Sequence, residues 1–168
     1  MRCMRRRSLV LLALLFGGVW LATEASAQAT TVPTTGFQVF LATLDPGTSF
    51  ISEDGVLHVR NQVNLFHQYG DLDGDVVVTG NVELDLATFT GRATAKASFS
   101  GTYTPSGVTG TFDGSAVTDI APGLFHTQGV LQGGGGFEGM KRFSDVVATN
   151  SFFATYSGYI LDPSGALQ

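Results

Sequence analysis

Cysteine and helical periodicity are both nearly missing from this sequence of 168 residues. The one cysteine is Cys3, so no disulfide can form within the chain, and no thiol nucleophile is present beyond the N-terminal segment. No segment has apolar residues at the three- and four-residue spacing of an amphipathic helix. No serine lies in the glycine-flanked turn of a hydrolase nucleophile elbow. These absences predict a fold held together by a core of strands and give no support to the common hydrolase chemistries.

Long apolar runs are also scarce, and the clearest one lies at the N-terminus. Four arginines within the first seven residues precede an apolar run from Leu9 to about Ala22, and Ala25-Ser26-Ala27 follows. This order of basic, apolar and A-x-A segments is typical of a secretory signal peptide. The apolar run is short for a membrane span. We therefore predict a signal peptide over residues 1–27 and export to the periplasm or the extracellular space, with an uncleaved N-terminal anchor as the alternative.

Basic residues are few in the rest of the chain. Residues 28–168 hold five Lys and Arg against thirteen Asp and Glu, a net charge of −8. Because an acidic surface repels polyanions, we expect neither nucleic acid nor, after cleavage of the signal, a membrane as partner. The length fits one domain. We predict a polar mobile lead-in over 28–36, a β-barrel domain over 37–162 and a C-terminal tail over 163–168.

Alternation with a period of two runs through most of the remaining sequence, and glycine, threonine and β-branched residues dominate it. Short turn sequences such as Asp45-Pro46-Gly47 separate the alternating segments. Hairpins in series build an antiparallel up-and-down sheet, and a sheet of about eight strands closes to remove its edges. The fold class is therefore all-β, a single antiparallel up-and-down barrel of about eight strands. The expected strands span about 37–44, 56–69, 75–86, 89–103, 108–118, 123–132, 137–149 and 151–161.

In the segment 89–103 the sequence shows most clearly which side chains share a face of the strand. Its inward face carries three alanines and a glycine between two phenylalanines, so little bulk lies in the middle of the strand. A barrel of eight strands has room for side chains or one small ligand. Either large neighbours fill this space, the candidates being Phe37, Phe99, Phe112, Phe152 and Tyr156, or a cavity remains. We predict a ligand cavity in the lumen, lined by Ala93, Ala95, Ala97 and Phe99.

A glycine-rich segment, GGGGFEG over residues 133–139, separates two strand patterns. Consecutive glycines allow a chain reversal with positive φ at low steric cost. We predict a hairpin whose return strand begins at about residue 137. Glu138 follows the turn, and we expect it at the exposed rim. The structural residues of the hairpin are Gly133, Gly134, Gly136, Phe137 and Gly139.

This hairpin segment resembles the glycine-rich hairpin of allene oxide cyclases and plant dirigent proteins. Residues 70–74 (GDLDG) and 160–163 (ILDP) resemble a turn and the closing strand of bacterial relatives of that barrel. The resemblance covers about residues 56–162 and is carried by structural glycines. It implies an eight-stranded antiparallel barrel, in a superfamily that includes cyclases and stereochemical guides and in which some lumens hold a small apolar molecule. It places no catalytic residue on this chain.

Three other patterns indicate neither a cofactor nor a metal. The G-x-G-x-x-G match within 134–139 is followed by a strand pattern, whereas dinucleotide binding needs a helix there. Asp71, Asp73 and Asp75 lack the glycine and glutamate that an EF-hand requires at its sixth and twelfth positions, so we expect solvated acids, with weak calcium binding as the alternative. His58 and His67 are nine residues apart and face opposite sides of an unbroken strand.

The segment 56–69 carries the candidate catalytic residues. Asn61, His67 and Tyr69 share a face with Leu57, Val59, Val63 and Leu65, and we expect that face to line the lumen. Polar side chains in a lumen bind a partner, a water or a ligand, so these three residues are candidates to orient a substrate or to act as acid and base. The alternative is that they are satisfied within the barrel or lie at its mouth, and a register shift of one residue would turn the set outward.

Two functions fit these observations. In the first, an exported barrel binds a small apolar molecule in its lumen without a cofactor, and it either carries that molecule or isomerises or cyclises it. In the second, the lumen is packed and the protein is a non-enzymatic structural or interaction module of the cell envelope. Either function is compatible with an oligomer.

Overall fold

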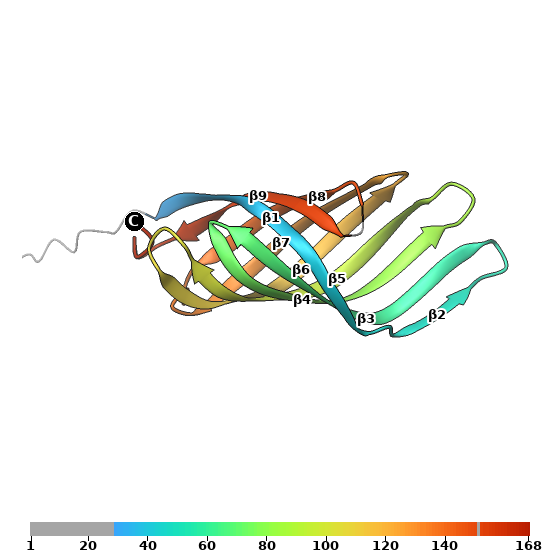
Figure 1. Cartoon of the computed structure of the whole chain (residues 1–168), viewed down its shortest axis with the longest axis horizontal. Coiled ribbons are helices and arrows are strands. Elements are labelled where there is room, and N and C mark those ends of the chain that lie inside the picture. The colour runs from blue at the N-terminus through green and yellow to red at the C-terminus, as the bar shows by residue number, and fades with distance from the viewer. Residues whose placement is uncertain (1–28, 151) are drawn as a thin grey trace, which may run out of the picture.

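Alternating side chains place nearly the whole described chain in long antiparallel strands (Figure 1). The computed structural model describes residues 29–150 and 152–168, and these contain no helix. The strands are β1 (Thr30–Asp45), β2 (Thr48–Ile51), β3 (Val56–Gly70), β4 (Leu72–Asp85), β5 (Thr90–Tyr103), β6 (Val108–Ala121), β7 (Leu124–Gly135), β8 (Lys141–Ala148) and β9 (Phe153–Asp162).

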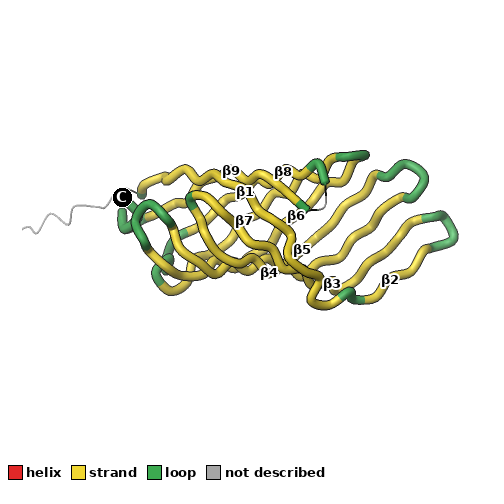
Figure 2. Tube along the Cα trace, in the orientation of Figure 1, coloured by secondary structure: helices red, strands yellow, loops and turns green. Residues whose placement is uncertain are grey.

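Strand pairing closes the sheet into a barrel. The order is β1-β9-β8-β7-β6-β5-β4-β3-β2, and β1 also pairs with β3. The predicted all-β, antiparallel, up-and-down barrel of eight strands is therefore confirmed. β2 is an additional short strand that continues along the edge of β3 after β1 has ended. The connections are short and lie at the two ends of the barrel (Figure 2).

The N-terminal boundary of the barrel lies earlier in the chain than we expected. We expected a polar mobile lead-in over 28–36, but residues 30–36 form the first part of β1 and pair with residues 156–162 of β9. These residues are rich in threonine, which suits a strand, and without them one edge of β9 would be unpaired. The predicted signal peptide over 1–27 lies outside the described residues. No helix within the described ranges is long and apolar enough to cross a membrane.

The end of the chain is also packed against the barrel. Leu167, in the segment that we expected to be a tail, is 4% exposed and belongs to the core. Asp162 is fully buried at the end of β9, where its carboxylate accepts hydrogen bonds from the backbone N–H groups of Ser164, Gly165 and Leu167. These bonds fold the segment 163–168 back onto the barrel.

The packed core lies at the end of the barrel that holds the turns β3–β4, β5–β6 and β7–β8. Phe99, Phe112 and Phe137 are fully buried there, and the rings of Phe112 and Phe137 stack with 4.6 Å between their centroids. Tyr156 crosses this core, and its hydroxyl accepts a hydrogen bond from the backbone N–H of Leu72 and donates one to the carbonyl oxygen of Leu72. Aromatic side chains therefore close one end of the barrel.

The glycine-rich hairpin differs in detail from our expectation. β7 continues to Gly135, a turn follows, and β8 begins at Lys141 instead of at about residue 137. Phe137 lies in the turn and folds inward, while Glu138 is exposed, as expected. A Cβ atom on Gly133 would lie 1.9 Å from the carbonyl oxygen of Phe137, so only glycine fits beside the inserted phenylalanine.

A β-bulge at Asn61 divides β3 into two parts. Asn61 has a φ of 56°, and the pairing of β3 with β4 shifts between Val59 and Gln62. An extra residue on one strand moves all the following side chains to the opposite face. Leu57 and Val59 therefore face the same side as the following even-numbered residues: Gln62, Asn64, Phe66 and Gln68.

Candidate functional site

The half of the barrel opposite the packed core contains a cavity of about 520 Å³. It opens at the end where the β2–β3 and β4–β5 hairpins project beyond β8 and β9 (Figure 1). Its walls come from all the barrel strands. Apolar wall residues include Phe40, Val82, Ile120 and Phe125.

Small side chains on β4 and β5 create this space. Gly80 pairs with Ala95, and Ala93 pairs with Val82, so little side-chain bulk projects from this part of the wall into the lumen. A Cβ atom on Gly80 would approach the Cβ atom of Ala95 to 3.2 Å, which shows how closely the two strands are packed. The floor includes Phe66, Val78 and Val146, which pack against the buried core below.

The structure separates the four predicted lumen residues into two pairs. Ala93 and Ala95 line the cavity. Ala97 packs against the core cluster, and Phe99 is fully buried within it. All four face inward, but only the first two are placed to contact a molecule in the cavity.

The aromatic residues that were candidates to fill the lumen are also divided. Phe99, Phe112 and Tyr156 fill the closed half. Phe37 lies on the outer face, 39% exposed, and Phe152 lies at the mouth, 68% exposed. The barrel is therefore filled at one end and open at the other.

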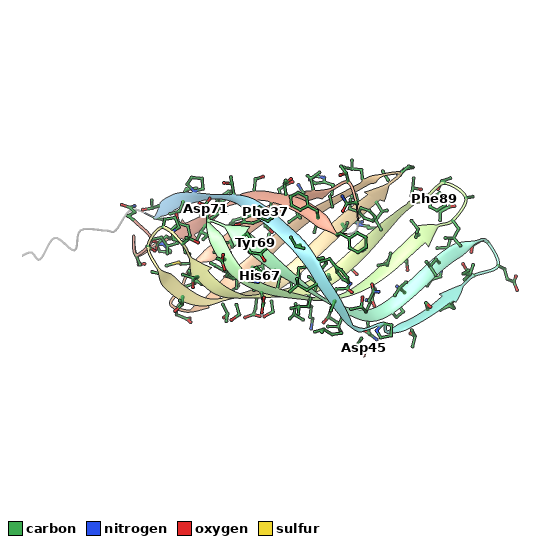
Figure 3. All side chains as sticks on the ribbon, viewed as in Figure 1. Phe37, Asp45, His67, Tyr69, Asp71 and Phe89 are labelled. Atoms are coloured by element: carbon green, nitrogen blue, oxygen red, sulfur yellow. The ribbon has the colours of Figure 1, made fainter. Side chains whose placement is uncertain are left out.

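The predicted orientation of His67 and Tyr69 is wrong, because the bulge at Asn61 turns the second part of β3 over. His67 and Tyr69 lie on the outer face of β3, where Figure 3 shows them beside Phe37 of β1. The Tyr69 ring stacks on that of Phe37 at 5.0 Å, and Tyr69 is 39% exposed. Asn61 is exposed at the bulge itself. None of the three lines the lumen.

His67 is instead held between two carboxylates on the outer surface. Its Nδ1 lies 2.7 Å from Oδ1 of Asp75, and its Nε2 lies 3.4 Å from Oδ1 of Asp73. Asp71 accepts hydrogen bonds from the backbone N–H and the hydroxyl of Thr35. The three acids therefore bind protein groups, and no cluster of three or more metal-binding side chains occurs in the described ranges.

The other two histidines are on the outer face as well. His58 lies beside Glu83, and His126 contacts both carboxylate oxygens of Asp145 at 2.9 and 3.0 Å. The hydrogen bond with His126 holds the pKa of Asp145 below its usual range. A hollow of about 540 Å³ on the outer wall borders Asp145, but the closed walls of the lumen would enclose a ligand more completely.

The polar groups of the cavity are residues that sequence reasoning missed. They are neutral amides and hydroxyls: Gln38, Thr43, Gln62, Asn64, Thr118, Thr127 and Asn150. No acid, base or other side chain that titrates near neutral pH lines the cavity among the described residues. The one signal in the sequence that could have indicated Gln62 and Asn64 is the neighbouring Asn61. Asparagine tolerates the left-handed conformation of a bulge, and a bulge there turns the following even-numbered residues inward.

Arg142 is the charged residue of the closed half. It is 2% exposed, and its Nε and Nη2 atoms have no hydrogen-bond partner within the described part of the chain. The guanidinium lies over the Phe99 ring at 5.7 Å and over the Tyr156 ring at 5.3 Å. Burial lowers the pKa of Arg142 to about 10, so the side chain is a cation at neutral pH. It is not among the residues that line the cavity.

No family model and no curated protein matches this chain. Among solved structures, it is similar to a protein of unknown function of the DUF3224 family from Shewanella oneidensis. The two share 14% sequence identity with a TM-score of 0.56, over 82% of this chain and 100% of the other. At this identity the likeness shows the fold alone.

Proposed function

We propose that this chain is an exported small β-barrel that binds a small, largely apolar molecule in the open half of its lumen, without a cofactor. The cavity beside Ala93 and Ala95 is the observation that carries the proposal. Its volume of about 520 Å³ lies in the range of small-molecule sites, and its wall is mostly apolar with a few neutral polar groups. Export is supported by the signal-like sequence of residues 1–27.

The lining favours binding over acid–base catalysis. General acids and bases must reach the proton that they transfer, and the described residues of the cavity offer only amides and hydroxyls. An isomerisation or cyclisation here would rely on holding the substrate in one conformation. That mode of action is the one that the resemblance to allene oxide cyclases and dirigent proteins suggests, and it requires the same cavity.

Native mass spectrometry of the exported protein, expressed from the full-length chain and purified gently, tests the proposal. We expect a discrete added mass that is lost on denaturation. Ala95→Phe fills the cavity and should abolish the added mass while leaving the fold intact. Thr94→Phe is the matched control, since Thr94 is the exposed neighbour on the same strand.

Two results would contradict this function. A folded Ala95→Phe variant that retains the added mass would place the ligand elsewhere. A wild-type protein that carries no added mass and takes up no apolar dye would favour the alternative, a non-enzymatic structural or interaction module of the cell envelope. The same spectra report whether the protein is a monomer or an oligomer.

A further inference from the structure

Two short chains of hydrogen-bonded side chains lie along the wall that β1 and β3 form. In the first, the Thr43 hydroxyl donates to Oδ1 of Asn64 at 2.9 Å, and Nδ2 of Asn64 donates to Oε1 of Gln62 at 3.3 Å. In the second, Nε2 of Gln68 donates to Oε1 of Gln38 at 3.3 Å. Both chains end in a glutamine that lines the cavity.

The direction of donation decides what these two glutamines offer. In each, the carbonyl oxygen accepts one bond from a neighbouring amide, and the amide nitrogen keeps both of its N–H donors for another partner. Neither Nε2 of Gln38 nor Nε2 of Gln62 has a hydrogen-bond partner among the residues that the structure describes. This wall of the cavity therefore presents donors.

The rest of the lining does not compete for these donors. The hydroxyls of Thr118 and Thr127 bond to each other at 2.7 Å, and most of the remaining wall is apolar. An amide N–H that loses water without gaining an acceptor costs free energy, so a ligand that covers these groups binds best when it brings acceptor oxygens.

The two donors lie at different depths. Positions 62 and 68 of β3 are six residues apart, roughly 20 Å along a strand. Gln38 pairs with Gln68, which is 3% exposed, so Gln38 lies near the closed half of the barrel. Gln62 follows the exposed Asn61 and pairs with Gly80, so it lies toward the mouth. Because Gln38 lies deeper in the barrel, we expect its donor to contribute more to selectivity than that of Gln62.

We propose that the cavity selects neutral apolar molecules that carry a carbonyl oxygen, such as a ketone, ester or lactone, with that oxygen accepting a hydrogen bond from Nε2 of Gln38 and with Gln62 assisting near the mouth. This inference rests on the proposed lumen binding. A carboxylate would also accept these bonds, but no cation lines the cavity in the described ranges to offset the cost of burying its charge. The selected group is therefore an uncharged carbonyl.

The test uses the exported protein with a fluorescent apolar dye, N-phenyl-1-naphthylamine, bound in the lumen. Three competitors of similar size are compared: benzophenone, diphenylmethane and diphenylacetate. We expect benzophenone to displace the dye at a concentration roughly three- to tenfold lower than diphenylmethane, the ratio that one net hydrogen bond provides. Diphenylacetate should compete least.

Two variants of Gln38 test whether its side chain causes the preference for benzophenone over diphenylmethane. Gln38→Glu keeps an oxygen that accepts from Gln68 and removes the free N–H donors, and Gln38→Met removes both. In either variant that folds, as judged by circular dichroism, benzophenone should lose its advantage over diphenylmethane. Gln128→Met, on the exposed outer face, should keep the wild-type ratio.

The outcomes separate this inference from the proposed function. Equal displacement by benzophenone and diphenylmethane in the wild-type protein would overturn carbonyl selection and leave lumen binding intact. A preference for diphenylacetate would overturn the neutral assignment. A protein that neither binds the dye nor gains mass in native spectra would overturn both proposals together.

Discussion

The guanidinium carbon of Arg142 lies 5.3 Å from the centre of the Tyr156 ring, in a core where no carboxylate of the described chain forms an ion pair with it. A ring face offsets only part of the cost of removing a cation from water. Burial also raises the pKa of Tyr156, so the phenol stays neutral beside the cation. Arg142 is thus a buried charge that the fold tolerates at a cost.

Replacing Arg142 with methionine should therefore stabilise the barrel. We expect Arg142→Met to raise the free energy of unfolding by about 1–3 kcal/mol at pH 7, measured by urea denaturation. Arg92→Met removes an exposed arginine and should change stability little. A large loss of stability in Arg142→Met would show that the aromatic contacts outweigh the cost of burial.

The advantage of Arg142→Met should depend on pH. The folded-state pKa of Arg142 is about 10, well below the ordinary value for arginine, so folding penalises the protonated form. The penalty is complete below about pH 10 and is relieved as the pH rises above that value toward the ordinary pKa of arginine. Urea midpoints of the wild type and the variant should converge in that range, and a constant gap would contradict the assignment.

The bulge at Asn61 predicts a contrast between two substitutions. Asn61→Gly should leave stability unchanged or raise it by up to about 1 kcal/mol, because glycine adopts a positive φ without strain. Asn61→Val should cost about 1–2 kcal/mol, since a β-branched residue resists that conformation. Thermal unfolding of both variants measures the difference. Equal stability would show that the left-handed backbone is not needed at this position.

Phe137 should account for much of the stability of the glycine-rich hairpin. Phe137→Ala empties a fully buried site against Phe112 and should cost about 3–5 kcal/mol. Glu138→Ala, at the exposed next position, is the control and should be close to neutral. Urea denaturation of the two variants compares them, and similar midpoints would mean that the hairpin repacks without the ring.

Asp162 should make stability sensitive to acid. Burial alone would raise the pKa of Asp162, but the hydrogen bonds from Ser164, Leu167 and Gly165 outweigh it and hold the pKa below its usual range. Its contribution is complete above the unfolded pKa of about 3.9 and is lost as the pH falls through the lower folded value.

Asp162→Asn should therefore cost about 1–3 kcal/mol at pH 7, and the difference from the wild type should shrink below about pH 4. Asp119→Asn, on the exposed outer face, should show no such loss. A deficit for Asp162→Asn that persisted unchanged at low pH would indicate a packing effect instead of an ionised carboxylate.

The sequence was sufficient to predict the barrel but not the faces of all its strands. Unbroken alternation in β5 predicted correctly that Ala93 and Ala95 face inward, because the period of two fixes a face wherever no residue is inserted. In β3 the single inserted residue Asn61 puts His67 on the outer face, where we had expected it in the lumen. The same insertion turns Gln62, which we had not expected there, into the lumen. A bulge adds one residue without changing the overall composition of the strand or its mean content of apolar residues. Alternation alone therefore could not locate it.

The start of β1 was missed for a different reason. Residues 30–36 are polar and contain Pro33, and taken locally they resemble a lead-in more than a strand. Their strand conformation depends on pairing with β9, more than a hundred residues away in the sequence. The local strand propensity of a segment contains no information about a pairing partner so far away in the sequence.

The pairing of β1 with β9 determines when the barrel can close during folding. β1 is held by β3 through residues 36–45 and by β9 through residues 30–39. During synthesis from the N-terminus, the contact with β3 can form early, whereas the full contact with β9 must wait until residue 162 has emerged. Until then the barrel is an open sheet with two unpaired edges and an uncovered lumen, so the interval before the last strand arrives is when the chain is most exposed to aggregation and proteolysis.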